Sequence, residues 1–385
     1  MNATAIRATN RSLQHQDETV VYDAPLLIAC TILFVLGLIM VGSASFAIAD
    51  RHFHQPAHYL WRQLFYAGVA LFLAYGVLHV SMAAWQRMSG GLLLLGLLLL
   101  LLVILPGVGR EVNGSSRWLS LGIANFQPSE FVKLAMLLYL SGYLVRRGDE
   151  VRAAVSGFIK PMLLLVLVSV LLLAEPDFGA AAVLMATAMG LMFLGGVRIW
   201  QFALLLFVVV VALALLAVAS PYRMARITAF INPWADPFDS GFQLTQALIA
   251  FGRGEWLGVG LGSSIQKLFY LPEAHTDFLF AVIAEELGLI SALLIIVLFA
   301  MIVWRAFVIG RRAERGGQPF AAYVAYGSGM WMGLQAFINI GVNMGILPTK
   351  GLTLPLMSYG GSSLIMSCIV VALLQRVAWE NHGSE

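Results

Sequence analysis

Asp277 stands where a polar loop meets a long apolar run, a position that suits a carboxylate able to take a proton. It ends the stretch Pro272–Asp277, and the apolar segment begins at Phe278. A carboxylate at a membrane rim can act as a general base toward an attacking hydroxyl group. The alternative is that Thr276 or Asp277 only caps the helix that starts there.

Glu285 lies eight residues further on, on the same predicted helical stripe as Asp277. At 1.5 Å per residue it would be about 12 Å deeper, which is too far for the two-carboxylate arrangement of a glycosidase. We therefore expect Asp277 to act as the base and Glu285 to organise the helix bundle.

A set of charged residues lies at or just inside the ends of apolar runs on one predicted side of the membrane. Ionisable groups at membrane depth are costly and by default mark a functional cavity. The basic members suggest a negatively charged ligand, whereas the alternative is that these side chains reach the interface or pair with one another. The set is Arg110, Glu111, Arg117, Glu130, Lys133, Glu175, Asp177, Asp277, Glu285, Glu286 and Lys350.

Glu130 and Lys133 open one of the apolar runs. Pro128 suits the first position of a helix, and the helix dipole favours Glu130 in the first turn. Lys133 follows three residues later and shares a face with Glu130. A buried lysine needs an anionic partner, so we expect Lys133 to contact either Glu130 or a ligand phosphate.

Two glycine-rich stretches, Gly258–Ser264 and Ser358–Ser363, could let a ligand approach the backbone. Exposed N–H groups together with the hydroxyls of Ser362 and Ser363 would suit a phosphate. The alternative is close helix packing through small residues.

The elements that must position these residues are membrane helices. The chain has 385 residues, of which 60% are apolar and 11% charged, whereas soluble domains carry about 25% charged residues. This composition excludes a soluble globular enzyme, and the continuous apolar runs exclude a membrane β-barrel. The net charge of +3 gives no argument for a nucleic-acid partner, and Cys30 and Cys368 each lie in an apolar run typical of buried, unpaired cysteine.

We predict an all-α polytopic membrane protein of about ten transmembrane helices. Residues 1–23 form a cytoplasmic tail, 24–378 the membrane domain and 379–385 a second cytoplasmic tail. A long periplasmic loop, 220–277, joins helices 7 and 8. The predicted spans are Ala24–Ile48, Leu60–Val80, Gly91–Val108, Pro128–Val145, Pro161–Ala174, Phe178–Gly195, Ile199–Ala219, Phe278–Ile309, Phe320–Ile346 and Leu352–Val377.

The basic residues of the short loops set the orientation. Clusters at 146–152 and 311–315 fall on one side, which we take as the cytoplasm. Both termini then lie in the cytoplasm, and the charged set around Asp277 faces outward. The absence of a Walker A sequence argues against ATP as the energy source.

Six ordered motifs resemble the SEDS family (shape, elongation, division and sporulation) of bacterial peptidoglycan glycosyltransferases, over nearly the whole chain after the N-terminal tail. The proline-rich motifs on either side of the eighth and ninth spans are similar to the division-type branch rather than the elongation-type branch. The motifs are Gly114–Trp118, Gln127–Lys133, Glu175–Gly179, Pro272–Phe278, Pro348–Gly351 and Pro355–Ser363.

The resemblance implies polymerisation of lipid II, a disaccharide-pentapeptide on undecaprenyl diphosphate, into β-1,4-linked strands during septal wall synthesis. It implies Asp277 as the base on the acceptor hydroxyl and Arg117, Glu130, Lys133, Asp177 and Lys350 as cavity residues. Trp118, His275 and Thr276 lie in the same motifs and are expected to support the site, as is Glu285.

The resemblance also implies a location and partners. It places the chain in the cytoplasmic (inner) membrane at the division septum, with a class B penicillin-binding transpeptidase and other membrane proteins of the division machinery. A divalent cation, Mg²⁺ or Mn²⁺, could assist, with ligands unknown, and no organic cofactor is expected. Alternatives are a lipid II flippase or other transporter, the elongation-type member of the family, and a scaffold without activity.

Overall fold

The structure is a computed structural model that describes residues 22–112, 115–120, 122, 125–204, 206, 207, 211, 230–239, 241–348 and 351–382. Its described part is a bundle of helices, which confirms the predicted class. The helices are α2 (Ala24–Phe53), α3 (His58–Leu78), α4 (Met82–Ile104), α5 (Pro128–Ala153), α6 (Val155–Ala174), α7 (Phe178–Leu194), α10 (Phe242–Gly254), α11 (Leu279–Arg315), α12 (Pro319–Asn343) and α13 (Gly361–Glu380).

Nine of the ten predicted spans correspond to a helix, and the seventh, Ile199–Ala219, lies largely outside the described residues. Six helices among the described residues are long and apolar enough to cross a membrane: α2, α3, α4, α6, α11 and α13. The apolar helix α7 is shorter. Helices α5 and α12 carry buried polar side chains, including Lys133 and Asn339, which lowers their hydropathy. The number of ten spans therefore stays a prediction.

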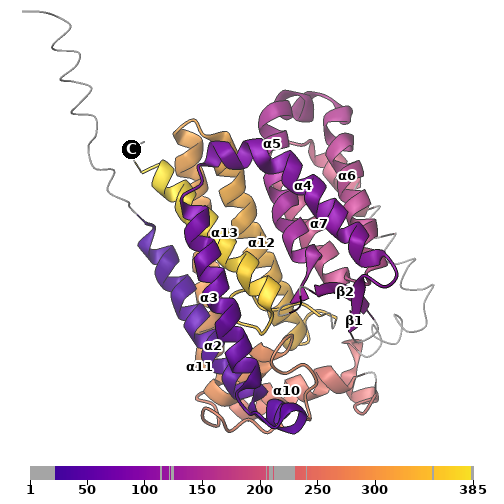
Figure 1. The fold of residues 1–385 in the computed structure, drawn as a ribbon, viewed down its shortest axis with the longest axis vertical. Coiled ribbons are helices and arrows are strands. Elements are labelled where there is room, and N and C mark those ends of the chain that lie inside the picture. The colour runs from indigo at the N-terminus through magenta and orange to yellow at the C-terminus, as the bar shows by residue number, and fades with distance from the viewer. Residues whose placement is uncertain are drawn as a thin grey trace, which may run out of the picture.

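The helices form two groups around a central pair. Figure 1 shows α2, α3 and α11 on one side, α4, α6 and α7 on the other, and α12 and α13 between them. Helix α5 packs against α4, α6, α7, α12 and α13. Helix α10 and the 3-10 turn η1 (Pro233–Ala235) belong to the predicted long loop and lie at the end opposite the C-terminus.

A small antiparallel sheet stands between α4 and α5, where the sequence predicts only a connecting segment. Its strands, in the order β1-β2-β3, are β1 (Gly109–Val112), β2 (Ser115–Ser120) and β3 (Asn125–Phe126). Arg117 lies on β2 where the register of the β1–β2 pair shifts, between Ser116, which faces Glu111, and Trp118, which faces Arg110. Because β2 also contacts α5, this short sheet contributes to the site.

The last helix begins nine residues later than predicted, at Gly361 instead of Leu352. Residues 351–360 are not helical, because Pro355 interrupts the segment and the Ser358 hydroxyl binds the Leu354 N–H at 2.9 Å. This segment passes so close to α2 that a Cβ on Gly37 would lie 2.5 Å from Met357 Cα.

We predict that Gly37→Ala lowers stability, because the added methyl group meets backbone atoms of Met357 that cannot move aside cheaply. Overpacking of this kind costs about 1–3 kcal/mol. Thermal unfolding in detergent measures the effect. The matched control is Gly68→Ala on α3, where an added Cβ meets nothing within 4 Å and the better helix former should be neutral or slightly stabilising. Equal unfolding temperatures for the two variants would contradict the close packing.

Candidate active site

Asp277 lies two residues before α11, and the residue is half-buried. Its side chain faces the backbone of Gly351, since a Cβ there would lie 3.0 Å from Asp277 Oδ2. Within the part of the chain that the structure describes, this carboxylate accepts no hydrogen bond. The capping alternative is therefore wrong: α11 starts at Leu279, and its first turn is capped by Asn343 Oδ1, which accepts from the Ala281 N–H at 3.0 Å.

The backbone around Asp277 is held by three amide side chains that follow one face of α12. Asn339 and Asn343 each donate from Nδ2 to the Asp277 carbonyl at 2.9 Å. Asn339 also donates to the Leu352 carbonyl, and Gln335 Nε2 donates to the Thr353 carbonyl at 3.0 Å. We call Gln335, Asn339 and Asn343 the amide ladder. Sequence reasoning missed it, although amides at intervals of four in an apolar helix were a readable signal.

Asp177 joins α7 to the start of α5. Its Oδ1 caps α7 by accepting from the Ala180 N–H at 3.1 Å, and its Oδ2 accepts from the Ser129 hydroxyl at 2.9 Å and from Gln127 Nε2 at 3.1 Å. These bonds occupy the carboxylate, so Asp177 fixes the corner between two helices. The sequence named Asp177 as a cavity residue but did not predict this positioning role.

Arg117 reaches from β2 across the same corner. Its Nε donates to the Glu175 carbonyl at 3.0 Å and its Nη2 to the Pro176 carbonyl at 2.6 Å. Both partners are neutral carbonyl groups, and no carboxylate among the described residues pairs directly with the Arg117 guanidinium. Its positive charge remains available to a negatively charged ligand at this end of the bundle.

Burial and neighbouring charges raise the pKa values of two carboxyl groups near Arg117, those of Asp277 and Glu175. The pKa of Asp277 is raised to about 7, chiefly by burial, with Glu273 and Asp177 contributing to the rise and Arg117 opposing it. Burial also raises the pKa of Glu175 to about 8, with Asp177 adding to the rise and Arg117 opposing it. Glu175 is 1% exposed, and neither carboxyl oxygen has a hydrogen-bond partner among the described residues.

Glu130 and Lys133 form a buried ion pair with 2.8 Å between Lys133 Nζ and Glu130 Oε1. Lys133 Nζ also donates to Gln335 Oε1 at 2.9 Å and lies 5.0 Å from the centre of the Trp331 ring. Of the two partners the sequence allowed for Lys133, the structure has Glu130. The pair links α5 to Gln335 of the amide ladder.

The hydroxyls of Ser362 and Ser363 are engaged within the protein. Ser362 Oγ accepts from the Gln127 N–H at 2.9 Å, and Thr353 Oγ1 donates to Ser363 Oγ at 2.7 Å. Both serines are buried. They join α13 to Gln127 and Thr353. Close helix packing, the alternative interpretation of this glycine-rich stretch, fits Gly361, where a Cβ would lie 2.6 Å from the Tyr66 ring.

Three further predicted site residues are His275, Thr276 and Trp118, of which the first two directly precede Asp277 in the chain. His275 is buried between the rings of Tyr59 and Tyr359 at 4.7 and 5.4 Å, and burial lowers its pKa. Thr276 Oγ1 donates to Glu273 Oε2 at 2.8 Å. Trp118 is half-buried on β2 and pairs with Arg110. The predicted site residue Lys350 lies outside the described residues.

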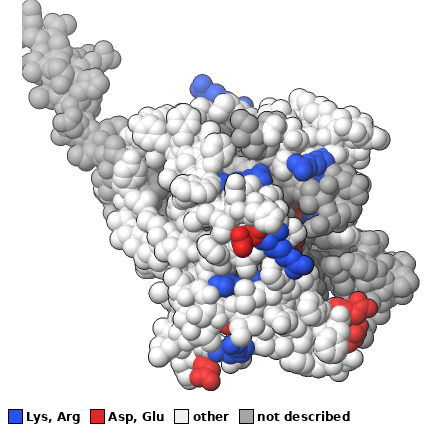
Figure 2. Space-filling view, turned by 60° about the horizontal axis from the view of Figure 1, so that its bottom comes forward, with Lys and Arg blue, Asp and Glu red and all other residues white. Residues whose placement is uncertain are grey.

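Glu285 belongs to a second polar cluster. It pairs with Arg253 at 2.9 Å, while its neighbour Glu286 pairs with Lys267 at 2.7 Å. Figure 2 shows this end of the molecule, where most of the surface is uncharged and the charged side chains form a few separate groups.

Known proteins are similar to this chain over nearly its whole length. The family of FtsW, RodA and SpoVE, described as cell cycle proteins, matches residues 24–383. This chain belongs to that family. A relative from Nitrosococcus halophilus, named Probable peptidoglycan glycosyltransferase FtsW, is 60% identical over 93% of this chain and 92% of its own length. A relative of the same name from Coxiella burnetii is 55% identical over 94% and 97%.

Solved structures of the FtsW/RodA/SpoVE family share the fold. A chain from a structure titled "Structural coordination of polymerization and crosslinking by a peptidoglycan synthase complex" is 30% identical, with a TM-score of 0.78. The rod shape determining protein RodA of Thermus thermophilus is 30% identical, with a TM-score of 0.69. Each comparison covers 94% of this chain and 99% of the other. The family and the fold thus agree with a multi-pass membrane protein of the cell cycle.

The described residues offer no cluster of metal ligands supplied by the protein alone. They contain no group of three histidine, cysteine, aspartate or glutamate side chains that could hold a metal ion. Asp177 is occupied by three hydrogen bonds from the protein. The Mg²⁺ or Mn²⁺ ion expected from the sequence therefore finds no matching ligand set in this part of the chain, and no step below depends on it.

We predict that Glu175 makes stability fall as pH rises. Its folded pKa of about 8 exceeds the ordinary value of 4.5, so the folded state holds an extra proton between these two values. That stabilisation is complete below pH 4.5 and is lost as pH rises through 8. Glu175→Gln should remove this slope and be more stable than the wild type at pH 9. Thermal unfolding at pH 6 and pH 9 measures it, and parallel curves for the two proteins would refute the assignment.

Proposed function

We propose that this chain is a peptidoglycan glycosyltransferase of the division type that polymerises lipid II at the outer face of the cytoplasmic membrane, with Asp277 as the general base. One observation carries the assignment of the base. Asp277 is a carboxylate without a hydrogen-bond partner among the described residues, while the amide ladder fixes its backbone. The relatives' names support the activity.

The proposed reaction is a single displacement at a sugar carbon. Asp277 accepts the proton of the acceptor 4-hydroxyl while that oxygen attacks the anomeric carbon of the donor. The bond from this carbon to the diphosphate breaks, and undecaprenyl diphosphate leaves. The developing negative charge lies near Arg117, whose guanidinium binds neutral carbonyls and no carboxylate among the described residues. Fixed positive charge of this kind stabilises the transition state more than the ground state.

The surroundings of Asp277 suit a base that works near neutral pH. A pKa of about 7 keeps the carboxylate partly ionised at pH 7 and makes it a stronger proton acceptor than an exposed aspartate. Burial lowers the pKa of His275, and its ring packs against those of Tyr59 and Tyr359. We assign to it a supporting role rather than proton transfer.

Partners and orientation complete the proposal. A class B penicillin-binding transpeptidase, together with other proteins of the division machinery, acts on the strands that this chain makes. Support comes from the solved relative whose title joins polymerization and crosslinking in one complex. Both termini lie in the cytoplasm, since the basic clusters at 146–152 and 311–315 belong on that side. The flippase alternative needs access from both faces, whereas Arg117, Asp177 and Asp277 gather at one end.

We predict that Asp277→Asn abolishes polymerisation without unfolding the protein. The amide keeps the size of the side chain but cannot accept the proton, and loss of a general base costs about 10²–10⁴-fold in rate. The assay is glycan-strand formation from purified lipid II with the partner transpeptidase, and thermal unfolding controls for folding. Full activity of the variant would exclude Asp277 as the base.

We predict an acid limb in the pH profile of the wild type. Polymerisation needs ionised Asp277, so the rate should be low at pH 5.5, half-maximal near pH 7 and level above pH 8. Initial rates at saturating lipid II measure this. A rate that stays constant from pH 5.5 to 8 would contradict a base with this pKa.

A further inference from the structure

Glu285 and Glu286 are adjacent carboxylates, both 0% exposed, and the proposed reaction uses neither of them. They occur where α11 is interrupted: Gly288 has φ +76° and ψ −177°, so the helix ladder stops there and resumes. Burying two neighbouring acids is costly unless each one is paired and hydrogen-bonded. The partners that meet this cost indicate what the pair does.

The loop after α10 replaces the hydrogen bonds that the break removes. In an uninterrupted helix, the carbonyls of Glu285 and Glu286 would accept from Leu289 and Ile290. Here they accept from the N–H groups of Val259 and Gly260 at 2.9 and 3.0 Å. The N–H groups of Leu289 and Ile290 donate instead to the carbonyls of Glu255 and Trp256. Residues 255–260 are thus inserted into the ladder of α11.

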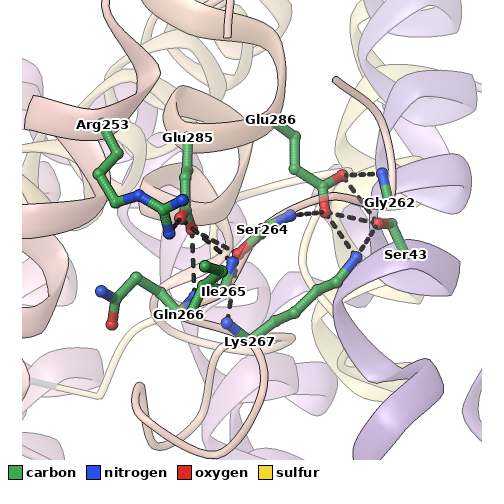
Figure 3. A network of polar contacts seen from close by, with 9 residues as sticks. All are labelled: Ser43, Arg253, Gly262, Ser264, Ile265, Gln266, Lys267, Glu285 and Glu286. Atoms are coloured by element: carbon green, nitrogen blue, oxygen red, sulfur yellow. Dashed lines mark hydrogen bonds and ion pairs between the residues drawn. The ribbon is translucent and has the colours of Figure 1, made fainter. Parts of the chain in front are cut away.

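The two carboxylates extend this connection to the following segment, 262–267. Glu285 accepts from the Ser264 hydroxyl and from the N–H groups of Ile265 and Gln266 at 3.2 and 3.3 Å. It also pairs with Arg253 at 2.9 Å. Figure 3 shows both carboxylates directed at this segment from α11.

Glu286 anchors the same segment to α2. It accepts from the Gly262 N–H at 3.0 Å and pairs with Lys267 at 2.7 Å. The Ser43 hydroxyl of α2 donates to Glu286, and Lys267 Nζ donates to Ser43 Oγ at 3.0 Å. We call Glu285, Glu286, Arg253, Lys267 and Ser43 the carboxylate clamp.

The clamp lies near the outer edge of the membrane. Ser43 follows the N-cap of α2, Asp23, by 20 residues, which corresponds to about 30 Å along a helix, the thickness of the hydrocarbon core. The count of 20 residues starts at Asp23, which pairs with Arg305 at the inner end of the bundle. Glu285 and Glu286 are 0% exposed and Lys267 is buried, so water competes weakly for their ion pairs and the clamp is held firmly.

The geometry points to the clamp as a positioning device: Glu285 and Glu286 join the two stems of the loop that carries Asp277, and so hold this carboxylate in place for the reaction. One stem is 262–267 and the other is the first part of α11, 279–287. Asp277 lies on the connection between them. The inference rests on the proposed function, because positioning matters only if Asp277 reacts.

The test removes both charges of the Glu286–Lys267 ion pair together, in the double variant Glu286→Gln with Lys267→Met. No charge is then left buried alone. We expect the variant to fold, with the turnover rate for lipid II reduced about 10- to 100-fold, the effect of misplacing a reacting group by about an ångström. The KM should change less than about twofold, because ligand contacts remain. Wild-type turnover in the double variant would overturn the inference.

A second readout needs no substrate. Thr276→Cys places a thiol beside Asp277, and its maleimide labelling rate in detergent reports the mobility of the loop. We expect labelling to be at least about fivefold faster when the clamp is removed, since local opening controls access to a held loop. Unchanged labelling would overturn the inference even if turnover fell. If wild-type protein with its partner did not polymerise lipid II, the proposed function would fail, while labelling would still test the clamp.

Two further variants test whether the effects are specific to the clamp. Glu150→Gln with Lys160→Met removes an ion pair at the cytoplasmic end, where the Lys160 side chain is 54% exposed, and should leave turnover and labelling unchanged. A loss of turnover there equal to that of the clamp variant would overturn the inference. Ser43→Ala removes only the link to α2. We expect a smaller loss of turnover and a smaller gain in labelling rate than in the double variant. If the double variant does not fold, Ser43→Ala provides the test of the clamp. No change in Ser43→Ala would then count against the clamp.

Discussion

The site depends on one constraint: peptide groups at membrane depth must find partners inside the protein. Two segments around Asp277 are not helical, residues 262–278 and 351–360. The amide ladder of α12 satisfies carbonyls of both segments, because Asn339 binds Asp277 and Leu352 while Gln335 binds Thr353. An irregular segment that carries a reactive carboxylate can therefore pack against the bundle without exposed peptide groups.

Buried charges, like buried peptide groups, need partners inside the protein. Among the described residues, the buried cations and most buried anions are paired: Lys133 with Glu130, Lys267 with Glu286, and Arg305 with Asp23. Two carboxyl groups near the site are exceptions among these residues: both oxygens of Glu175 are buried without a hydrogen-bond partner, and the Asp277 carboxylate accepts no hydrogen bond. Paired charges build the scaffold, and the raised pKa values of the unpaired ones mark where proton chemistry is possible.

The sequence predicted the helices well because continuous apolar runs determine membrane helices with little help from packing. It also predicted Asp277, Asp177 and Arg117 in one place, since charged residues in so apolar a chain are few. It could not predict which of them would be used as caps or ion-pair partners, because those bonds join residues far apart in the chain. Ser362 and Ser363 show the limit: hydroxyls that suited a phosphate bind Gln127 and Thr353 instead. The break at Gly288 was missed because a single glycine in an apolar run is also typical of an intact helix.

The amide ladder and the carboxylate clamp divide the work of holding Asp277 according to their chemistry. Neutral amides bind peptide carbonyls directly at the site, where an added charge would shift the pKa of the base. The carboxylates bind N–H groups and cations further away, at the stems of the loop. Placing the strong, charge-assisted bonds at a distance gives firm support. Placing the neutral bonds at the centre leaves the proton affinity of Asp277 to be set by burial, Glu273, Asp177 and Arg117. Position and reactivity of the carboxylate are therefore governed by different residues.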